Sequence, residues 1–143
     1  MVTLDASVWL AAAFPGEPSH EVALALLGHV TRAGIPVSQP TLFVVEVAGA
    51  VRRRTGSAAA AEAAIEQVAG LDLVTLRALD GDDAMGAAAL AGRLGLRGAD
   101  AVYLAHAITV GTALVTLDDE LLVRGAAVAD VWTPAAWLAH HSP

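Results

Sequence analysis

The sequence predicts an α/β fold in which a central, mostly parallel sheet of four or five strands lies between two layers of helices. Short apolar segments rich in β-formers alternate with longer segments whose apolar residues recur at helical spacing. Consecutive parallel strands need a crossover, and right-handed helical crossovers cover both faces of such a sheet. Within its 143 residues the chain shows no linker, internal repeat or low-complexity tail, so we expect a single domain over residues 1–143.

The first half of the chain is predicted to form two strands and four helices. Asp5 and Ser7 can cap the first helix and Ser19 the second, and the cations at 52–54 complement the C-terminus of the third. The expected elements are a strand over 2–4, a helix over 8–14, a helix between Ser19 and Gly34, a strand over 35–38, a helix that opens at Pro40 or Thr41 and ends by Gly56, and a helix over 57–70.

The second half is predicted to continue the alternation. Residues 71–76 alternate as in a half-buried strand, and the carboxylates at 80–83 suit the positive end of a helix dipole. The expected elements are a strand over 71–76, a helix over 80–94, a helix over 98–109, a strand over 113–116, a short helix over 118–123, an edge strand over 128–132 and a helical turn over 134–140.

Charge and composition limit the range of partners and cofactors. The net charge is −7 and lysine is absent, so a broad basic surface for nucleic acid is not expected, and an RNA substrate would need a local arginine patch and a bridging metal. An acidic, apolar protein also suits a basic partner. Cysteine is absent, which excludes disulfides, thiolate catalysis and Cys-ligated metals, so a metal must be held by carboxylates or histidines.

Membrane attachment is not expected from the sequence. The N-terminus lacks the basic start and apolar run of a signal peptide, and no uncharged apolar stretch approaches the roughly 20 residues of a membrane span. We therefore expect a cytoplasmic protein.

Asp5 and Asp118 each follow an apolar predicted strand. In open α/β sheets, ligands bind in the crevice beyond the carboxyl ends of the strands, where neighbouring connections leave in opposite directions. If the first and fourth strands are neighbours, both side chains face that crevice. The alternative is that each carboxylate is an ordinary helix N-cap.

Glu46 and Asp100 lie in apolar surroundings at helical spacing. Glu46 has Leu42 and Val45 among its neighbours and no polar helix face to occupy, which favours a paired or metal-bound carboxylate. Asp100 is similar, although it also fits a first-turn carboxylate favoured by the helix dipole. Four converging carboxylates with no lysine or arginine to neutralise them would recruit Mg²⁺ or Mn²⁺, and such a site suits phosphodiester hydrolysis.

Four short stretches resemble the PIN-domain family, and specifically its VapC toxins. They are Val2-Thr3-Leu4-Asp5-Ala6-Ser7, the apolar helix around Glu46, Gly98-Ala99-Asp100-Ala101, and Leu114-Val115-Thr116-Leu117-Asp118. The resemblance implies a three-layer α/β/α domain. It also implies that Asp5, Asp100 and Asp118 hold the principal metal, and that Glu46 serves that metal, a second one or the attacking water. Ser7 and Thr116 match positions whose hydroxyls support the site.

The same resemblance implies an activity and partners. VapC toxins are endoribonucleases that act on structured RNA, often tRNA or ribosomal RNA, as dimers inhibited by a cognate antitoxin. The sequence departs from that pattern by having Asp119-Glu120 directly after Asp118, which leaves open whether Asp118 or Asp119 is the ligand. The candidate phosphate contacts are Arg52, Arg53, Arg54 and Arg97, each of which also fits a helix-end charge without a partner.

Two other functions fit parts of the sequence. An aspartyl-phosphate phosphatase of the haloacid-dehalogenase type also begins with an aspartate after its first strand, but it needs a second aspartate two residues later and a lysine. Position 7 is serine and lysine is absent, which argues against that interpretation. A non-catalytic PIN-like module that only binds a partner is the alternative from another class, and the intact acidic residues argue against it.

Overall fold

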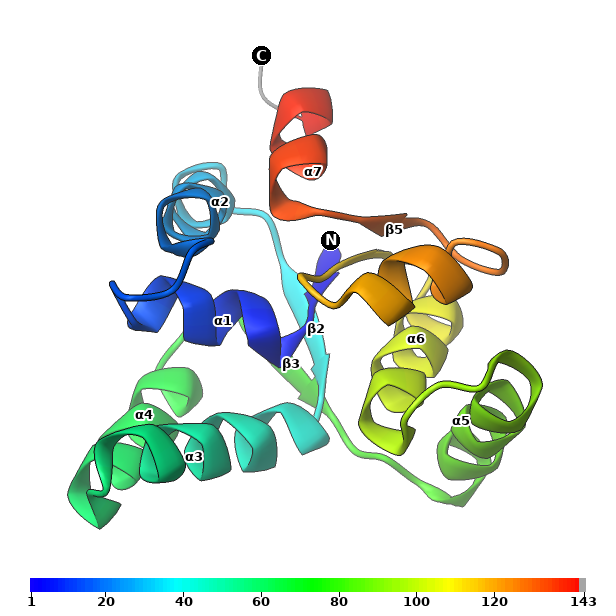
Figure 1. The fold of residues 1–143 in the computed structure, drawn as a ribbon, viewed down its shortest axis with the longest axis horizontal. Helices are drawn as coiled ribbons and strands as arrows, with labels where there is room; N and C mark the ends of the chain where they lie inside the picture. Colours follow the sequence, from blue (N-terminus) through cyan, green and yellow to red (C-terminus); the bar gives the residue numbers. More distant parts are fainter. Residues whose placement is uncertain (142–143) are drawn as a thin grey trace.

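The computed structural model describes residues 1–141 and contains a five-stranded parallel sheet of order β3-β2-β1-β4-β5 (Figure 1). The predicted fold class is therefore confirmed, and the first and fourth strands are neighbours, with Val2 opposite Ala113. The strands are β1 (Val2–Leu4), β2 (Val37–Pro40), β3 (Val74–Arg77), β4 (Ala113–Val115) and β5 (Val131–Trp132).

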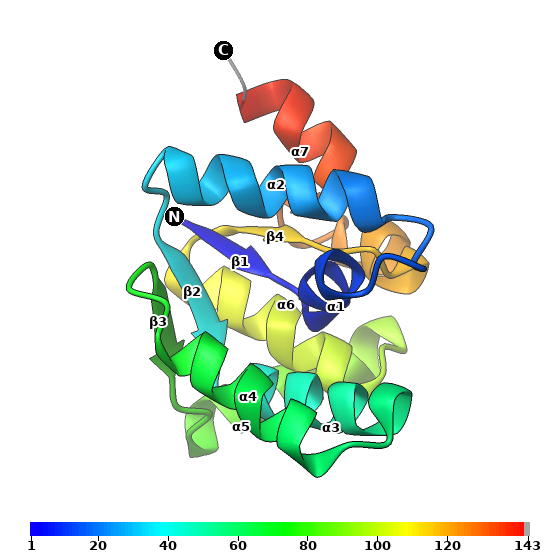
Figure 2. The same ribbon diagram turned by 90° about the vertical axis from the view of Figure 1, so that its left-hand side faces the viewer.

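Helices cover both faces of this sheet. Figure 2 shows α2 and α7 on one side of β1 and β4, and α6 on the other. The helices are α1 (Ala6–Ala13), α2 (His20–Arg32), α3 (Leu42–Thr55), α4 (Ala58–Ala69), α5 (Gly81–Leu94), α6 (Gly98–Val110), the π-helical turn η1 (Leu121–Gly125) and α7 (Pro134–His141). None of the helices within residues 1–141 combines the length and the apolarity needed to cross a membrane.

Alternating strand residues divide the core between the two faces. Leu4 and Val115 pack with α1, α2 and α7, whereas Leu114 packs with α3 and α6. All three side chains are fully buried. Burying apolar area on both faces favours this sheet by about 25 cal/mol per Å², and it explains why the central strands β1 and β4 are short, mostly apolar runs rather than alternating ones.

Several predicted strand boundaries were wrong by a few residues. β2 covers 37–40 instead of 35–38, so Pro40 ends a strand and α3 begins only at Leu42. β3 begins at Val74 instead of 71, because the chain turns after α4 and the Val74 N–H donates to the Leu71 carbonyl. β5 is shortened to Val131–Trp132, because the N–H groups of residues 128 and 129 turn back onto the carbonyl of Gly125.

The helical boundaries also shift. α1 begins at Ala6, directly after Asp5, rather than at 8. The short helix expected over 118–123 is the π-helical turn Leu121–Gly125. The last helix runs to His141, one residue beyond the predicted turn. These differences leave the order of the elements as predicted.

The topology places a switch point between β1 and β4. From β1 the chain proceeds through β2 to β3 on one side, and then returns to place β4 on the other side of β1. The two strands end side by side, and the N–H of Asp5 donates to the Val115 carbonyl at 2.9 Å. This is the part of an open α/β sheet where ligand sites form.

Candidate active site

A cavity of about 550 Å³ lies at this edge of the sheet, between α1, α3, the start of α6 and the segment after β4. All four predicted carboxylates line it, together with Ser7 and three arginines, and Asp119 does not. The lining acids are Asp5, Glu46, Asp100 and Asp118. Residues that are far apart in the chain therefore meet in one cavity, and Asp118 rather than Asp119 faces it.

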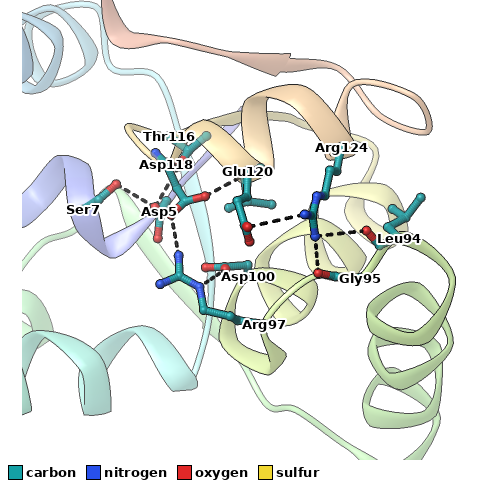
Figure 3. A network of polar contacts seen from close by, with 11 residues as sticks. Asp5, Ser7, Leu94, Gly95, Arg97, Asp100, Thr116, Asp118, Glu120 and Arg124 are labelled. Carbon is teal, nitrogen blue, oxygen red and sulfur yellow. Dashed lines mark hydrogen bonds and ion pairs between the residues drawn. The ribbon is translucent and has the colours of Figure 1, made fainter.

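Asp5 is held by two hydroxyl groups. It follows β1 directly and is only 7% exposed. Its Oδ2 accepts hydrogen bonds from Ser7 Oγ at 2.6 Å and from Thr116 Oγ1 at 2.8 Å (Figure 3). Asp5 occupies the N-cap position of α1, but its side chain does not cap the helix. The N-cap alternative therefore describes where the residue lies but not what its carboxylate does.

The same two hydroxyls also fix the segment after β4. Thr116, which is fully buried, accepts a hydrogen bond from the Asp118 N–H at 3.0 Å, and Ser7 Oγ accepts one from the Leu117 N–H at 3.2 Å. Hydrogen bonds to an ionised group are stronger than those between neutral groups. Ser7 and Thr116 thus connect the ends of β1 and β4 through the carboxylate of Asp5.

Asp118 uses its two oxygens differently. Oδ1 accepts a hydrogen bond from the Leu121 N–H at 3.0 Å, which caps the start of η1, and Oδ2 accepts one from Arg97. Asp118 therefore caps a helical turn, as the alternative interpretation held, and also lines the cavity. The cap orients the carboxylate because it fixes one oxygen on the backbone and leaves the other toward the cavity.

The expectation that no arginine neutralises the carboxylates was wrong. Arg97 Nε donates to Asp100 Oδ2 at 2.8 Å, and its other end pairs with Asp118 (Figure 3). Asp100 lies in the first turn of α6, where burial raises its pKa although Arg97 acts to lower it. As the side chains lie, no three acidic or histidine residues within 1–141 are arranged so that they could hold a metal ion.

Glu46 is the least compensated of the four acids. It projects from α3, and its Oε2 is buried with no hydrogen-bond partner in the described part of the chain. Burial raises the pKa of Glu46, although the nearby Tyr103 hydroxyl acts to lower it, and the negative charges of Asp5 and Asp100 raise it further. A buried carboxylate oxygen without a partner is costly, which marks Glu46 as a group that a cation would stabilise.

Tyr103 is a residue of this site that the sequence analysis did not single out. It is fully buried on α6, and its hydroxyl lacks a hydrogen-bond partner of good geometry within residues 1–141. Burial raises the pKa of Tyr103, and the nearby carboxylate of Glu46 raises it further. The sequence feature that could have identified Tyr103 is its position three residues after Asp100, which puts both side chains on the same face of the helix.

The raised pKa of Glu46 predicts a pH-dependent effect on stability. A carboxyl group whose pKa is higher in the folded chain favours the folded state when protonated, so its contribution falls as the pH rises from its ordinary value of 4.5 through the folded value. Metal-free Glu46→Gln should be more stable than wild type at pH 7, by up to about 1 kcal/mol for a partly exposed charge. The gain should disappear below about pH 4.5.

Urea unfolding in EDTA between about pH 4 and pH 8 measures this difference. Glu62→Gln, an exposed position on α4, is the matched control and should change stability by less than about 0.5 kcal/mol. A wild-type protein that equals or exceeds Glu46→Gln in stability at pH 7 would contradict the burial argument.

The arginines predicted to contact phosphate do not share one environment. Arg53 and Arg54 line the cavity, whereas Arg52 does not. Arg54 also forms an ion pair with Glu17 and lies over the Phe14 ring, 4.8 Å from its centroid. The arginine run therefore presents two of its three charges to the site.

Comparison with solved structures finds similar folds, toxins among them. The structure is similar to VapC20 of Mycobacterium tuberculosis, described as a sarcin-ricin loop cleaving toxin, with a TM-score of 0.74 and 22% identity over 90% of this chain and 96% of that chain. It is similar to FitAcB of Neisseria gonorrhoeae, with a TM-score of 0.71 and 19% identity over 94% and 99% of the two chains. A toxin-antitoxin complex of Klebsiella pneumoniae gives a TM-score of 0.66 and 19% identity over 94% and 98%.

Sequence comparison identifies the family. No curated protein matches the chain significantly. The family model of the PIN domain, however, matches residues 2–126, a range that contains β1 to β4 and all four carboxylates of the cavity. Because this match covers most of the chain, the chain belongs to the PIN domain family.

Proposed function

We propose that this protein is a metal-dependent endoribonuclease and the toxin of a type II toxin-antitoxin pair, acting in the cytoplasm as a homodimer. One observation carries the proposal: Asp5, Glu46, Asp100 and Asp118 come from four separate segments and line one cavity at the switch point of the sheet. Charges gathered in this way are costly without a cation, and PIN family membership supports a hydrolase that acts on RNA.

The donor set fits a hard divalent cation. All four candidate ligands are carboxylates, which suit Mg²⁺ and Mn²⁺, and the unpartnered Oε2 of Glu46 is an oxygen that such an ion would satisfy. Asp5, Asp100 and Asp118 would hold the principal ion, and Glu46 would serve it, a second ion or the attacking water. When bound, the metal supplies a water of lowered pKa and neutralises charge on the phosphate.

Neighbouring groups of the protein hold the candidate ligands in position. Ser7 and Thr116 hold the Asp5 carboxylate in one orientation, and the backbone of Leu121 holds that of Asp118. Groups fixed in this way lose little freedom when the substrate arrives, which is one contribution of the protein to such a hydrolysis. Arg53, Arg54 and Arg97 line the same cavity and are the candidate contacts for a phosphate backbone.

The proposed substrate is structured RNA, such as ribosomal RNA or tRNA. The similar fold of VapC20, a toxin described as cleaving the sarcin-ricin loop, supports this class. The direct test is incubation of purified protein with ribosomal RNA and tRNA in Mn²⁺ or Mg²⁺, and cleavage should stop on adding EDTA. If the antitoxin-free protein cuts no RNA in Mn²⁺ or Mg²⁺ but still binds an antitoxin, the protein is instead a non-catalytic partner-binding module.

Arg53 should contact RNA phosphate. Arg53→Gln should weaken RNA binding at low salt and reduce the slope of log K against log salt by about 0.7, the value for one phosphate contact with a single strand. Arg52→Gln is the matched control, because Arg52 belongs to the same helix end but does not line the cavity. Binding measured by fluorescence anisotropy at several salt concentrations decides this, and equal slopes for all three proteins would remove Arg53 from the site.

The apolar groove on the outer helices suits the proposed antitoxin. A cavity of about 300 Å³ between α1, α2, α3 and α4 adjoins a second of about 440 Å³, and Trp9, Leu27 and Leu71 line both. Most of the side chains that line the two cavities are apolar, which suits the apolar face of an amphipathic segment. The net charge of −7 favours a basic amphipathic segment as the occupant.

Leu24 offers a test of this groove, since it lines the first cavity and is 49% exposed. Leu24→Arg should weaken the antitoxin complex at least about tenfold, as expected when one central apolar contact is lost. Val123→Arg, at an exposed position of η1 outside the groove, should leave affinity unchanged. Calorimetry with the protein encoded by the adjacent reading frame measures both, and equal affinities would place the antitoxin elsewhere.

A further inference from the structure

Arg97 occupies the position between two of the candidate ligands. Its Nε donates to Asp100 Oδ2 at 2.8 Å, and its Nη2 pairs with Asp118 Oδ2. In Figure 3 the guanidinium lies between these two carboxylates. The Arg97 side chain is 67% exposed, whereas those of Asp100 and Asp118 are 12% and 22% exposed. A solvent-facing cation thus covers two largely buried anions.

The backbone that carries Arg97 is firmly attached. Arg124 donates to the carbonyls of Gly95 and Leu94, and its guanidinium also pairs with Glu120 at 3.4 Å (Figure 3). Gly95 adopts a positive φ of 67° that closes α5, and Leu96 is buried beside it. The connection from α5 to α6 is therefore hydrogen-bonded to η1 just before Arg97, which restrains the backbone that carries this side chain.

A guanidinium and a divalent cation held on the same carboxylates repel each other, so each weakens the binding of the other. Oδ2 of both Asp100 and Asp118 is engaged by Arg97, and like charges placed within a few ångströms repel. Asp5 and Glu46, by contrast, form no ion pair with an arginine in the described residues, so Arg97 blocks only two of the four candidate ligands.

We propose that Arg97 is an internal counter-ion that competes with the divalent metal for Asp100 and Asp118, and so sets the metal affinity of the site. This inference rests on the proposed metal-dependent function. In the metal-free protein, Arg97 offsets the repulsion of the clustered carboxylates. A bound metal would displace the Arg97 side chain toward solvent, and its planar donors would then be free to contact RNA phosphate.

The test compares Mn²⁺ affinity among charge-matched variants. Arg97→Gln should bind Mn²⁺ about three- to tenfold more tightly than wild type, since a competing ion pair is removed. Arg53→Gln removes the same charge from the same cavity but from a side chain with no carboxylate partner in the described residues, and it should change affinity less than about twofold. Arg97→Lys keeps the positive charge but lacks the planar guanidinium that bridges the two carboxylates. Its Mn²⁺ affinity should lie between those of wild type and Arg97→Gln.

A second measurement separates competition from a general charge effect. In EDTA, Arg97→Gln should unfold at a lower temperature than wild type, and the stabilisation by saturating Mn²⁺ should be larger in the variant. Isothermal titration and thermal unfolding give both readouts without RNA. If Arg97→Gln and Arg53→Gln gain Mn²⁺ affinity equally, or if Arg97→Gln gains none, this inference is overturned while the proposed function stands. No Mn²⁺ binding by any of the proteins would overturn the proposed function together with it.

Discussion

Replacement of Asp5 by asparagine should reduce metal-dependent RNA cleavage by at least about 10²-fold, the lower end of what one positioned catalytic group contributes. Asn keeps the shape of the side chain and one carbonyl oxygen for the hydroxyls of Ser7 and Thr116, but it removes the charge that would attract the cation. The fold should remain, as judged by circular dichroism. Initial rates of cleavage at saturating Mn²⁺ measure the effect.

Asp119→Asn provides the matched control for this loss. Asp119 lies beside Asp118 in the chain, but it is exposed and does not line the cavity, so its removal should leave the rate within about twofold. If Asp5→Asn cleaves RNA as fast as wild type, or if Asp119→Asn is equally inactive, the assignment of the four carboxylates is wrong.

Thr116→Val should weaken Mn²⁺ binding by about 10- to 100-fold, the usual cost of removing a group that orients a metal ligand. Valine has nearly the same shape as threonine but no hydroxyl. Its introduction removes the donor to Asp5 Oδ2 and the acceptor of the Asp118 N–H, so two candidate ligands lose their orientation together. Isothermal titration with Mn²⁺ measures the loss directly.

Thr3→Val separates this effect from general destabilisation. Thr3 is as fully buried as Thr116 and lies on the neighbouring strand, but its hydroxyl bonds to Thr112 at 2.7 Å rather than to a site residue. It should cost stability, about 1 kcal/mol for one lost hydrogen bond, without altering Mn²⁺ affinity. Similar Mn²⁺ affinities for Thr116→Val and wild type would show that Thr116 supports only the fold.

The main features of the fold and of the cavity follow from short-range patterns. Asp5 and Asp118 were predicted to meet because each follows an apolar strand, and the carboxyl ends of neighbouring parallel strands lie at one edge. Glu46 was singled out because an acid amid apolar residues has no solvated face to occupy. The positions of these acids relative to strand ends and helix faces are written locally in the sequence, whereas the pairing of the first strand with the fourth was a condition that the structure supplies.

The misplaced strand ends show where local patterns fail. Residues 35–36 and 71–73 resemble the strands they precede, and only the pairing of Val37 with Val74 decides where the ladder begins. That pairing depends on the positions of two distant segments, which no local window contains.

The ionic contacts of the site were even harder to predict from the sequence. Arg97 was predicted as a phosphate contact, and its pairing with Asp100 and Asp118 depends on how one long side chain turns at a helix start. Tyr103 resembles an ordinary core aromatic in the sequence, because its hydroxyl gains significance only from the nearness of Glu46. Side-chain direction between distant elements is set by packing, not by spacing along the chain.

The insertion of β4 beside β1 has a consequence for biosynthesis. The hydroxyl of Thr116 and the carboxylate of Asp5 that it holds are separated by 111 positions, so the centre of the sheet stays open until most of the polypeptide has left the ribosome. Pairing across such a separation is slow compared with local helix formation. A nascent chain should thus lack the assembled carboxylate cavity, which forms only as translation nears its end.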